Sequence, residues 1–162
     1  MNRFLSWRGH AWIAIVARLY LGGVFLFACA HKILHPGVFA LDVATYQLLP
    51  LGLVNVFALV LPWIELLVGL MLVLGTRTRA AALLVAAMMI AFMAALGWAL
   101  HLDLQLSCGC FASQAAAADD PISWHTLVRD SLWLVLSLYV VVFDRNPIGI
   151  ERLSRRRSER HA

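Results

Sequence analysis

Apolar residues form four long runs along the chain, and the segments between them carry most of the charged residues. The runs cover about residues 12–30, 53–74, 81–100 and 124–143. Each is close to the roughly 20 residues that an α-helix needs to cross the hydrocarbon core of a bilayer. The pattern therefore predicts an all-α membrane protein, a four-transmembrane-helix bundle that forms a single domain over residues 1–162, with a basic tail at residues 144–162.

Composition and charge support this class. Hydrophobic residues make up 62% of the chain and charged residues only 14%, whereas soluble domains are about half apolar and a quarter charged. The net charge of +4 could indicate a nucleic-acid partner, but six of the 13 Lys and Arg residues lie from Arg145 onward, directly after the last apolar run. A basic run beside a membrane segment is an orientation signal and can contact anionic lipid. Lipid is therefore the expected partner, and nucleic acid is not.

The distribution of arginine predicts the orientation of the bundle. Basic residues gather in three segments: around Arg3 and Arg8, at Arg77 and Arg79, and in the tail. The other two connecting segments carry Lys32 alone. Under the positive-inside rule both termini are cytoplasmic and two loops lie outside, which for a bacterium means an inner-membrane protein with periplasmic loops. Arg18 interrupts the first run, and the run is long for the core of a signal peptide, so we interpret it as a retained helix.

All three cysteines fall at the predicted outer side. Cys108 and Cys110 lie in the sequence LSCGCF of the second outer loop, and Cys29 lies near the outer end of the first run. Disulfides form and persist in an oxidising compartment such as the periplasm. A Cys-x-Cys pair closes a small, strained ring, which makes its disulfide easier to reduce. The pair therefore favours thiol–disulfide exchange, with Cys108 and Cys110 as the catalytic residues and Cys29 as a candidate relay.

Two other interpretations of the Cys-Gly-Cys segment stay open. One is a structural role, as a disulfide that does not exchange or as two buried thiols. The other is a metal site that adds Cys29 or His101 to the pair, although we expect no metal. Met88, Met89 and Met93 could suggest copper, but methionine at helical spacing in an apolar run is more often packing.

Charged residues inside the apolar runs are costly and usually pair or serve a function. Arg18 lies about six residues from the inner end of the first run, and Glu65 about nine from the inner end of the second. At 1.5 Å per residue their depths differ by only about 5 Å, which a long arginine can span. We therefore predict a buried Arg18–Glu65 pair. It would either hold the two helices together or form part of a proton or quinone-headgroup site.

A further group of polar residues lies at the predicted outer rim: His31, Lys32, His35 and Asp130. They could anchor the helices at the interface, polarise a thiol or bind an anionic headgroup. Arg129 and Asp130 are adjacent, so they point about 100° apart on a helix and we expect one of them to face the bundle.

Several short sequences, taken in order, resemble a known family. They are an Arg in the first helix, then LGGVF, HKI, YQLLP, LPWIELLVGLMLVLGTRTRAA, CGCF, and an Arg-Asp near the top of the fourth helix. Together they resemble the MauE branch of the DoxX-like membrane proteins over about residues 18–134. The resemblance implies a role in methylamine utilisation, in which such a protein assists maturation of the disulfide-rich small subunit of methylamine dehydrogenase with a thioredoxin-like partner.

The sequence thus favours a membrane protein of periplasmic thiol–disulfide handling, with thiol–disulfide oxidoreductase activity as the enzymatic form of this hypothesis. Cys108 and Cys110 would cycle with a periplasmic thioredoxin-like protein or a disulfide-containing substrate, and a quinone could accept the electrons. Two alternatives remain. One is a non-enzymatic scaffold or chaperone for a periplasmic redox protein, and the other is a small transporter for a metal or organic solute that uses Glu65 and Arg18.

The predicted orientation can be tested with a membrane-impermeant maleimide on intact spheroplasts of a Cys29→Ser variant. After mild reduction we expect Cys108 and Cys110 to be labelled from outside. A cysteine introduced in the tail by Ser158→Cys, in a variant lacking the three native cysteines, should react only after the membrane is permeabilised. The reverse pattern would overturn the assignment of sides.

Overall fold

The computed structural model describes residues 9–102 and 124–144 of the chain, and within them all regular structure is α-helical. The helices are α2 (Gly9–Leu34), α3 (Pro36–Thr45), α4 (Leu51–Leu74), α5 (Thr78–His101) and α6 (Trp124–Phe143). Four of them are long and apolar enough to cross a membrane. The predicted all-α fold and the four spans are confirmed. The short helix α3 was not predicted, and the side of the membrane on which each terminus lies stays a prediction.

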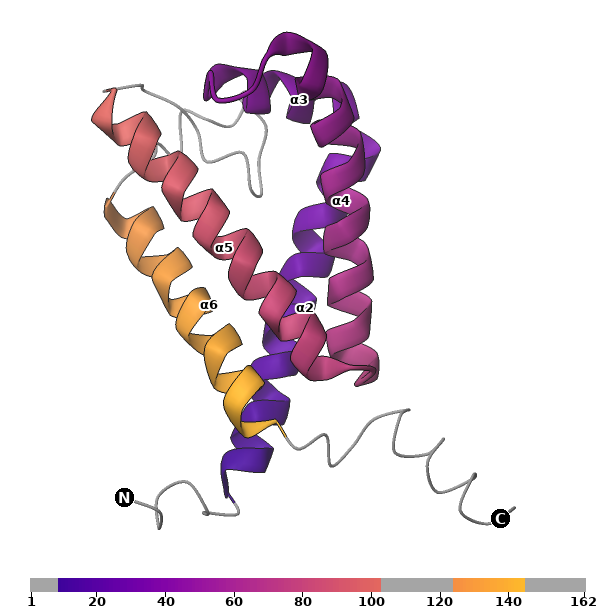
Figure 1. The fold of residues 1–162 in the computed structure, drawn as a ribbon. Helices are drawn as coiled ribbons and strands as arrows, with labels where there is room; N and C mark the ends of the chain where they lie inside the picture. The colour runs from indigo at the N-terminus through magenta and orange to yellow at the C-terminus, as the bar shows by residue number, and fades with distance from the viewer. Residues whose placement is uncertain (1–8, 103–123, 145–162) are drawn as a thin grey trace.

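The long helices form two antiparallel pairs, α2 with α4 and α5 with α6 (Figure 1). The pairs lie close together at the end that carries the exposed Arg77 and Arg79, which we call the arginine end. They diverge toward the opposite end, which we call the α3 end because α3 lies across it (Figure 1). The bundle is therefore closed at one end and splayed at the other.

The backbones of α2 and α4 approach each other closely at two glycines. A Cβ atom added to Gly22 would lie 2.7 Å from Val73 Cγ2 and 3.1 Å from the carbonyl oxygen of Gly69. A Cβ added to Gly69 would lie 3.0 Å from Leu26 Cγ and 3.2 Å from the carbonyl oxygen of Gly22. Small residues at helix interfaces allow this kind of close packing in membranes. The contact makes Gly22 and Gly69 level with each other and fixes the register of the pair.

The apolar core lies in the half of the bundle near the arginine end. Its buried members come from all four long helices: Ala17, Leu21, Phe25, Val68, Leu72, Ala81, Ala82, Val85, Trp133 and Val140. Along α5 the side chains up to Ala86 include several buried ones, but none is fully buried again until Leu96. On α5 the side chains are therefore more exposed over residues 87–95 than at the two ends of the helix, where Leu96 and Ala99 are again fully buried.

The turn between α4 and α5 positions the two exposed arginines. Gly75 adopts a left-handed conformation with φ 71° and ends α4, and its N–H donates to the carbonyl oxygen of Met71. This is a glycine C-cap, which satisfies a carbonyl at the helix end. Arg77 follows with φ 43° and precedes α5. The connection is short enough to make the two helices antiparallel neighbours.

The glycine contact makes a direct prediction about stability. Gly22→Ala should lower the stability of the bundle by about 1–3 kcal/mol, because the new methyl group overpacks against Val73 and the Gly69 carbonyl. Gly23→Ala is the matched control, since a Cβ at Gly23 meets no atom within 4 Å. Unfolding of the purified variants in mixed micelles by SDS would measure the difference. Equal stabilities would show that the close approach is not rigid.

Candidate functional site

A buried ion pair joins α2 and α4 in the splayed half of the bundle. The Nζ atom of Lys32 lies 2.6 Å from Oε1 of Glu65, and the two side chains are only 7% and 8% exposed. The aromatic ring of Phe39, from α3, lies 5.0 Å from the ammonium group as a cation–π partner. Helix α3 thus covers the pair from the α3 end.

This pairing corrects the predicted Arg18–Glu65 pair, which is wrong. Because Gly22 is level with Gly69 and the helices are antiparallel, Arg18 is level with Val73, about 12 Å from the level of Glu65 at 1.5 Å per residue. Direction matters as well, since helical side chains tilt toward the N-terminus of their own helix. Glu65 therefore points toward the α3 end, away from Arg18, while Lys32 points from the α3 end toward Glu65.

Arg18 pairs instead with a residue at the arginine end. Its Nη1 atom lies 3.5 Å from Oδ2 of Asp144, which directly follows α6, and both side chains are buried. Beside them, Nδ1 of His10 lies 2.7 Å from the hydroxyl oxygen of Tyr139. The His10 ring also stacks on Phe143 at 4.4 Å between centroids. These contacts tie α2 to α6 and close the arginine end.

The Lys32–Glu65 pair has unused hydrogen-bonding capacity. The Oε2 atom of Glu65 is buried and has no hydrogen-bond partner in the described part of the chain. The ammonium group of Lys32 has three N–H donors, and the one bond seen for it among the described residues is to Glu65. The pair therefore presents one vacant acceptor and vacant donors side by side, in a place where unmade hydrogen bonds are costly.

Cys29 lies one turn before Lys32 on the same helix and is fully buried. Its thiol donates to the carbonyl oxygen of Leu26 at 3.2 Å. It is close enough to the Lys32–Glu65 pair for both charges to act on the sulfur. Cys108 and Cys110, the two residues on which the redox hypothesis depends, lie outside the described residues, so a relay through Cys29 stays a prediction.

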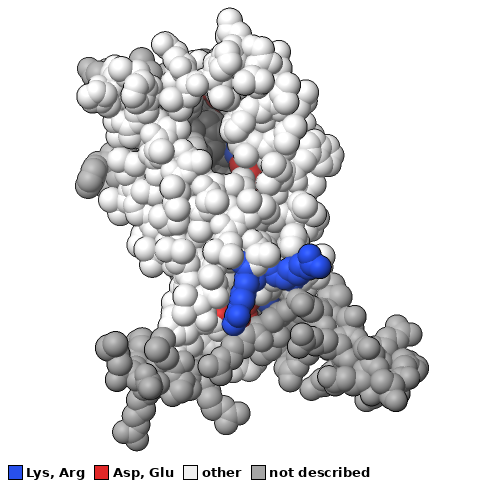
Figure 2. Space-filling view, in the orientation of Figure 1, with Lys and Arg blue, Asp and Glu red and all other residues white. Residues whose placement is uncertain are grey.

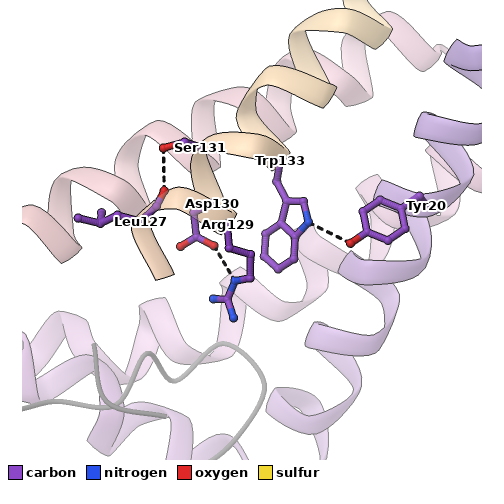
Figure 3. A network of polar contacts seen from close by, with 6 residues as sticks. All are labelled: Tyr20, Leu127, Arg129, Asp130, Ser131 and Trp133. Atoms are coloured by element: carbon purple, nitrogen blue, oxygen red, sulfur yellow. Dashed lines mark hydrogen bonds and ion pairs between the residues drawn. The ribbon is translucent and has the colours of Figure 1, made fainter. Parts of the chain in front are cut away.

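A second polar group lies on α6 (Figure 3). The Nε–H of Arg129 donates to Oδ1 of Asp130 at 3.2 Å, and its guanidinium lies 4.9 Å from the centroid of the Trp133 ring. Asp130 is fully buried, whereas the Arg129 side chain is 32% exposed. The Nε1–H of Trp133 faces the hydroxyl oxygen of Tyr20 at 3.4 Å. The expectation that one of the two adjacent charges faces the bundle is met by Asp130, and the long Arg129 side chain folds back to it.

The predicted rim residues separate into different environments. Lys32 and Asp130 are buried, while His31 is half-buried, with its ring 5.2 Å from that of His35. The aromatic partners Phe39, Trp133 and Tyr20 were missed by sequence reasoning. Of these three, only the contact of Trp133 with Arg129 could have been expected from the sequence. Trp133 lies four residues after Arg129, which places the two on the same helix face.

The surface of the bundle is hollowed between α4 and α5, in the half nearer to α3 (Figure 2). Basic and acidic atoms are visible inside this hollow, whereas the surrounding surface is formed by uncharged residues (Figure 2). The hollow opens sideways, toward the region that lipid would occupy. Within residues 9–102 and 124–144, no three His, Cys, Asp or Glu side chains gather as metal ligands would.

Comparison with known proteins assigns the chain to a family. The sequence model of the family described as methylamine utilisation protein MauE matches residues 10–143. The chain belongs to the MauE family. It is also 32% identical over 124 residues to the methylamine utilization protein MauE of Paracoccus denitrificans, a match that covers 76% of this chain and 65% of that relative. The chain thus spans less than two thirds of the length of that protein.

The family assignment confirms the resemblance found in the sequence. The matched region of this MauE family member includes Lys32, Glu65, the Cys-Gly-Cys segment and the Arg129–Asp130 group. No solved structure matches the chain.

Replacing one residue of the Lys32–Glu65 pair should destabilise the protein more than replacing both. Lys32→Met leaves the Glu65 carboxylate buried without its partner, a change that typically costs about 3–5 kcal/mol. The double variant Lys32→Met with Glu65→Leu removes both charges and should recover most of that loss, because an apolar pair needs no compensation. Arg79→Gln, at an exposed position, is the control and should change little. SDS unfolding of the four proteins measures the effects, and a double variant that is no more stable than Lys32→Met would argue against the pair.

Proposed function

We propose that this protein is a multi-pass membrane protein of thiol–disulfide handling, which uses Cys108 and Cys110 to exchange disulfides with a partner protein in the periplasm. The observation that carries the proposal is topological. Helix α5 ends and α6 begins at the α3 end (Figure 1), opposite the exposed Arg77 and Arg79. In the sequence the Cys-Gly-Cys segment lies between these two helix ends, and the buried Lys32–Glu65 pair lies in the half of the bundle that includes them.

The proposed exchange is a pair of thiol–disulfide substitutions. A thiolate of the reduced partner attacks one sulfur of the Cys108–Cys110 disulfide, which forms a mixed disulfide and releases the other sulfur as a thiol. The second thiol of the partner then attacks the mixed disulfide. The partner leaves with a disulfide, and Cys108 and Cys110 hold the two electrons and two protons as a dithiol. The short ring between the two cysteines favours this direction, because a strained disulfide is more readily reduced.

The family supplies the context. A relative in Paracoccus denitrificans is named for methylamine utilization, and we infer that this chain serves a pathway of that type in a bacterial inner membrane. The partner would be a disulfide-rich periplasmic protein such as the small subunit of methylamine dehydrogenase, or a thioredoxin-like carrier that acts on it. Re-oxidation of the Cys108–Cys110 dithiol then needs an electron acceptor, and a membrane quinone is the class of molecule that we propose for it.

The proposal is tested by trapping the redox state of the cysteines in membranes with a mass-shifting alkylating reagent. Cys108 and Cys110 should change from disulfide to dithiol when a reduced partner is added. Cys108→Ser with Cys110→Ser should abolish formation of the partner's disulfides, and each single variant should do the same because it cannot form the Cys108–Cys110 disulfide. Cys29→Ser separates the relay from the exchange pair, since only a relay would make this variant defective.

A different result would identify the alternatives. Full maturation of the partner by the double serine variant would refute the redox role and favour a scaffold. Loss of solute uptake on Glu65→Gln, with the cysteines still inert toward the partner, would favour a transporter.

A further inference from the structure

We infer that the Lys32–Glu65 pair forms the binding site for the headgroup of a membrane quinone, which enters through the hollow between α4 and α5. The inference rests on the proposed function, because it gives a location and a set of residues to the electron acceptor that re-oxidation of the dithiol requires. Two observations carry it: the vacant hydrogen-bonding positions of the pair, and the hollow with a sideways opening in the same half of the bundle (Figure 2).

The unused hydrogen-bonding groups of Lys32 and Glu65 determine which class of ligand fits the site. Lys32 keeps N–H groups that donate to no described residue, and Glu65 keeps one buried carboxylate oxygen without a hydrogen-bond partner among the described residues. A phosphate headgroup would be attracted by Lys32 but repelled by Glu65, and a cation would meet the opposite conflict. A neutral headgroup avoids both conflicts if it can accept from Lys32 and donate to Glu65.

A quinone fits these positions in both of its redox states. In the oxidised form a carbonyl oxygen accepts a hydrogen bond from the Lys32 ammonium. In the reduced form a hydroxyl group donates to Oε2 of Glu65. As electrons arrive, negative charge develops on the quinone oxygen, and a fixed ammonium group in a water-poor site stabilises that charge.

The middle of α5 suits contact with an apolar ligand that arrives from the lipid. Between Ala86 and Leu96, α5 has no fully buried side chain. In this stretch Met88 and Met89 are half-buried and pack against the apolar core, and Met93 is half-buried. Methionine is flexible and polarisable, and it is common at surfaces that adapt to apolar ligands. A ring with an isoprenoid tail can therefore lie between α4 and α5 while its polar atoms reach the Lys32–Glu65 pair.

The redox step balances without another reactant. The Cys108–Cys110 dithiol loses two electrons and two protons and becomes a disulfide. The quinone gains the same two electrons and two protons and becomes a hydroquinone. Glu65 is the group placed to pass a proton to the nearer oxygen, with Lys32 holding that oxygen in position. Neither residue undergoes a net change over the cycle.

Quinone binding can be tested separately from thiol chemistry. The protein used carries Cys108→Ser and Cys110→Ser and is reconstituted in lipid nanodiscs. A photoreactive azido-quinone is cross-linked in the presence of increasing amounts of a short-chain ubiquinone analogue, and labelled peptides are identified by mass spectrometry. We expect competed labelling on α2, α4 and α5 around the hollow. Label confined to other helices, or label that the analogue does not compete, would overturn the inference.

Substitutions of the pair give the quantitative test. Lys32→Met with Glu65→Leu removes both charges and should weaken the competition by the analogue at least tenfold, because hydrogen bonds to charged groups are lost. The matched control is Arg18→Met with Asp144→Leu, which removes the other buried pair and should leave the affinity within about twofold. Circular dichroism verifies folding of both. Unchanged affinity in the first variant would refute the site.

Glu65→Gln is a milder variant that preserves volume and hydrogen bonding, so it keeps the inference testable if the double variant does not fold. In protein with native cysteines it should bind the quinone within a few-fold of normal, yet reduce it from the dithiol at least tenfold more slowly. A normal reduction rate would remove Glu65 from the proton path.

The two proposals fail in different ways. If the quinone binds at the pair but Cys108 and Cys110 never exchange disulfides with the partner, the proposed function is wrong and the quinone site stands. If Cys108 and Cys110 form disulfides in the partner while no quinone binds near Lys32 and Glu65, the site is wrong and the proposed function stands. Suppression of the label by phosphatidylglycerol, but not by the quinone analogue, would make the hollow a lipid site and refute the inference.

Discussion

The close approach of the α2 and α4 backbones at Gly22 and Gly69 sets the level of every polar side chain on these two helices. With the helices antiparallel and their levels fixed, the tilt of side chains toward each helix N-terminus decides which charges can meet. Lys32 and Glu65 point toward each other, and Arg18 points toward the arginine end, where Asp144 lies. The Lys32–Glu65 pair is therefore a consequence of one contact between two glycines, and the same contact keeps Arg18 away from Glu65.

The two ends use their charged residues differently. At the arginine end, the Arg18–Asp144 pair lies beside the His10–Tyr139 hydrogen bond and the stacked Phe143 ring, and the four long helices are packed around an apolar core. At the α3 end the helix pairs diverge, and charged atoms are visible inside a hollow (Figure 2). The first arrangement holds helices together. The second combines an opening with polar groups, which is the combination that ligand sites require.

The sequence was sufficient to predict a membrane protein and its four spans. An apolar run of about 20 residues has few stable structures other than a membrane-spanning helix. It also identified Arg18 and Glu65 as buried charges. Their partners could not be predicted from depth alone, since depth counted from the ends of apolar runs ignores the register between helices. Gly22 within LGGVF, and Gly69 within the second-helix block, carried that information, but only the fold shows that they face each other. Helix α3 and the cover that Phe39 gives to Lys32 had no clear signal, because a ten-residue apolar segment is too short to be distinguished from a loop by composition.

Stability alone does not account for the Lys32–Glu65 pair. Two charges in a bundle that is otherwise apolar bring a desolvation cost that their attraction offsets only when the remaining hydrogen-bonding positions are also filled, and an apolar pair of similar volume is often as stable or more so. Here those positions are vacant among the described residues, on both the lysine and the carboxylate. The arrangement is thus costlier than a simple ion pair and has no evident structural benefit over the apolar alternative. A ligand that fills the vacant donor and acceptor together removes this cost, because it supplies the hydrogen bonds that the buried lysine and carboxylate lack.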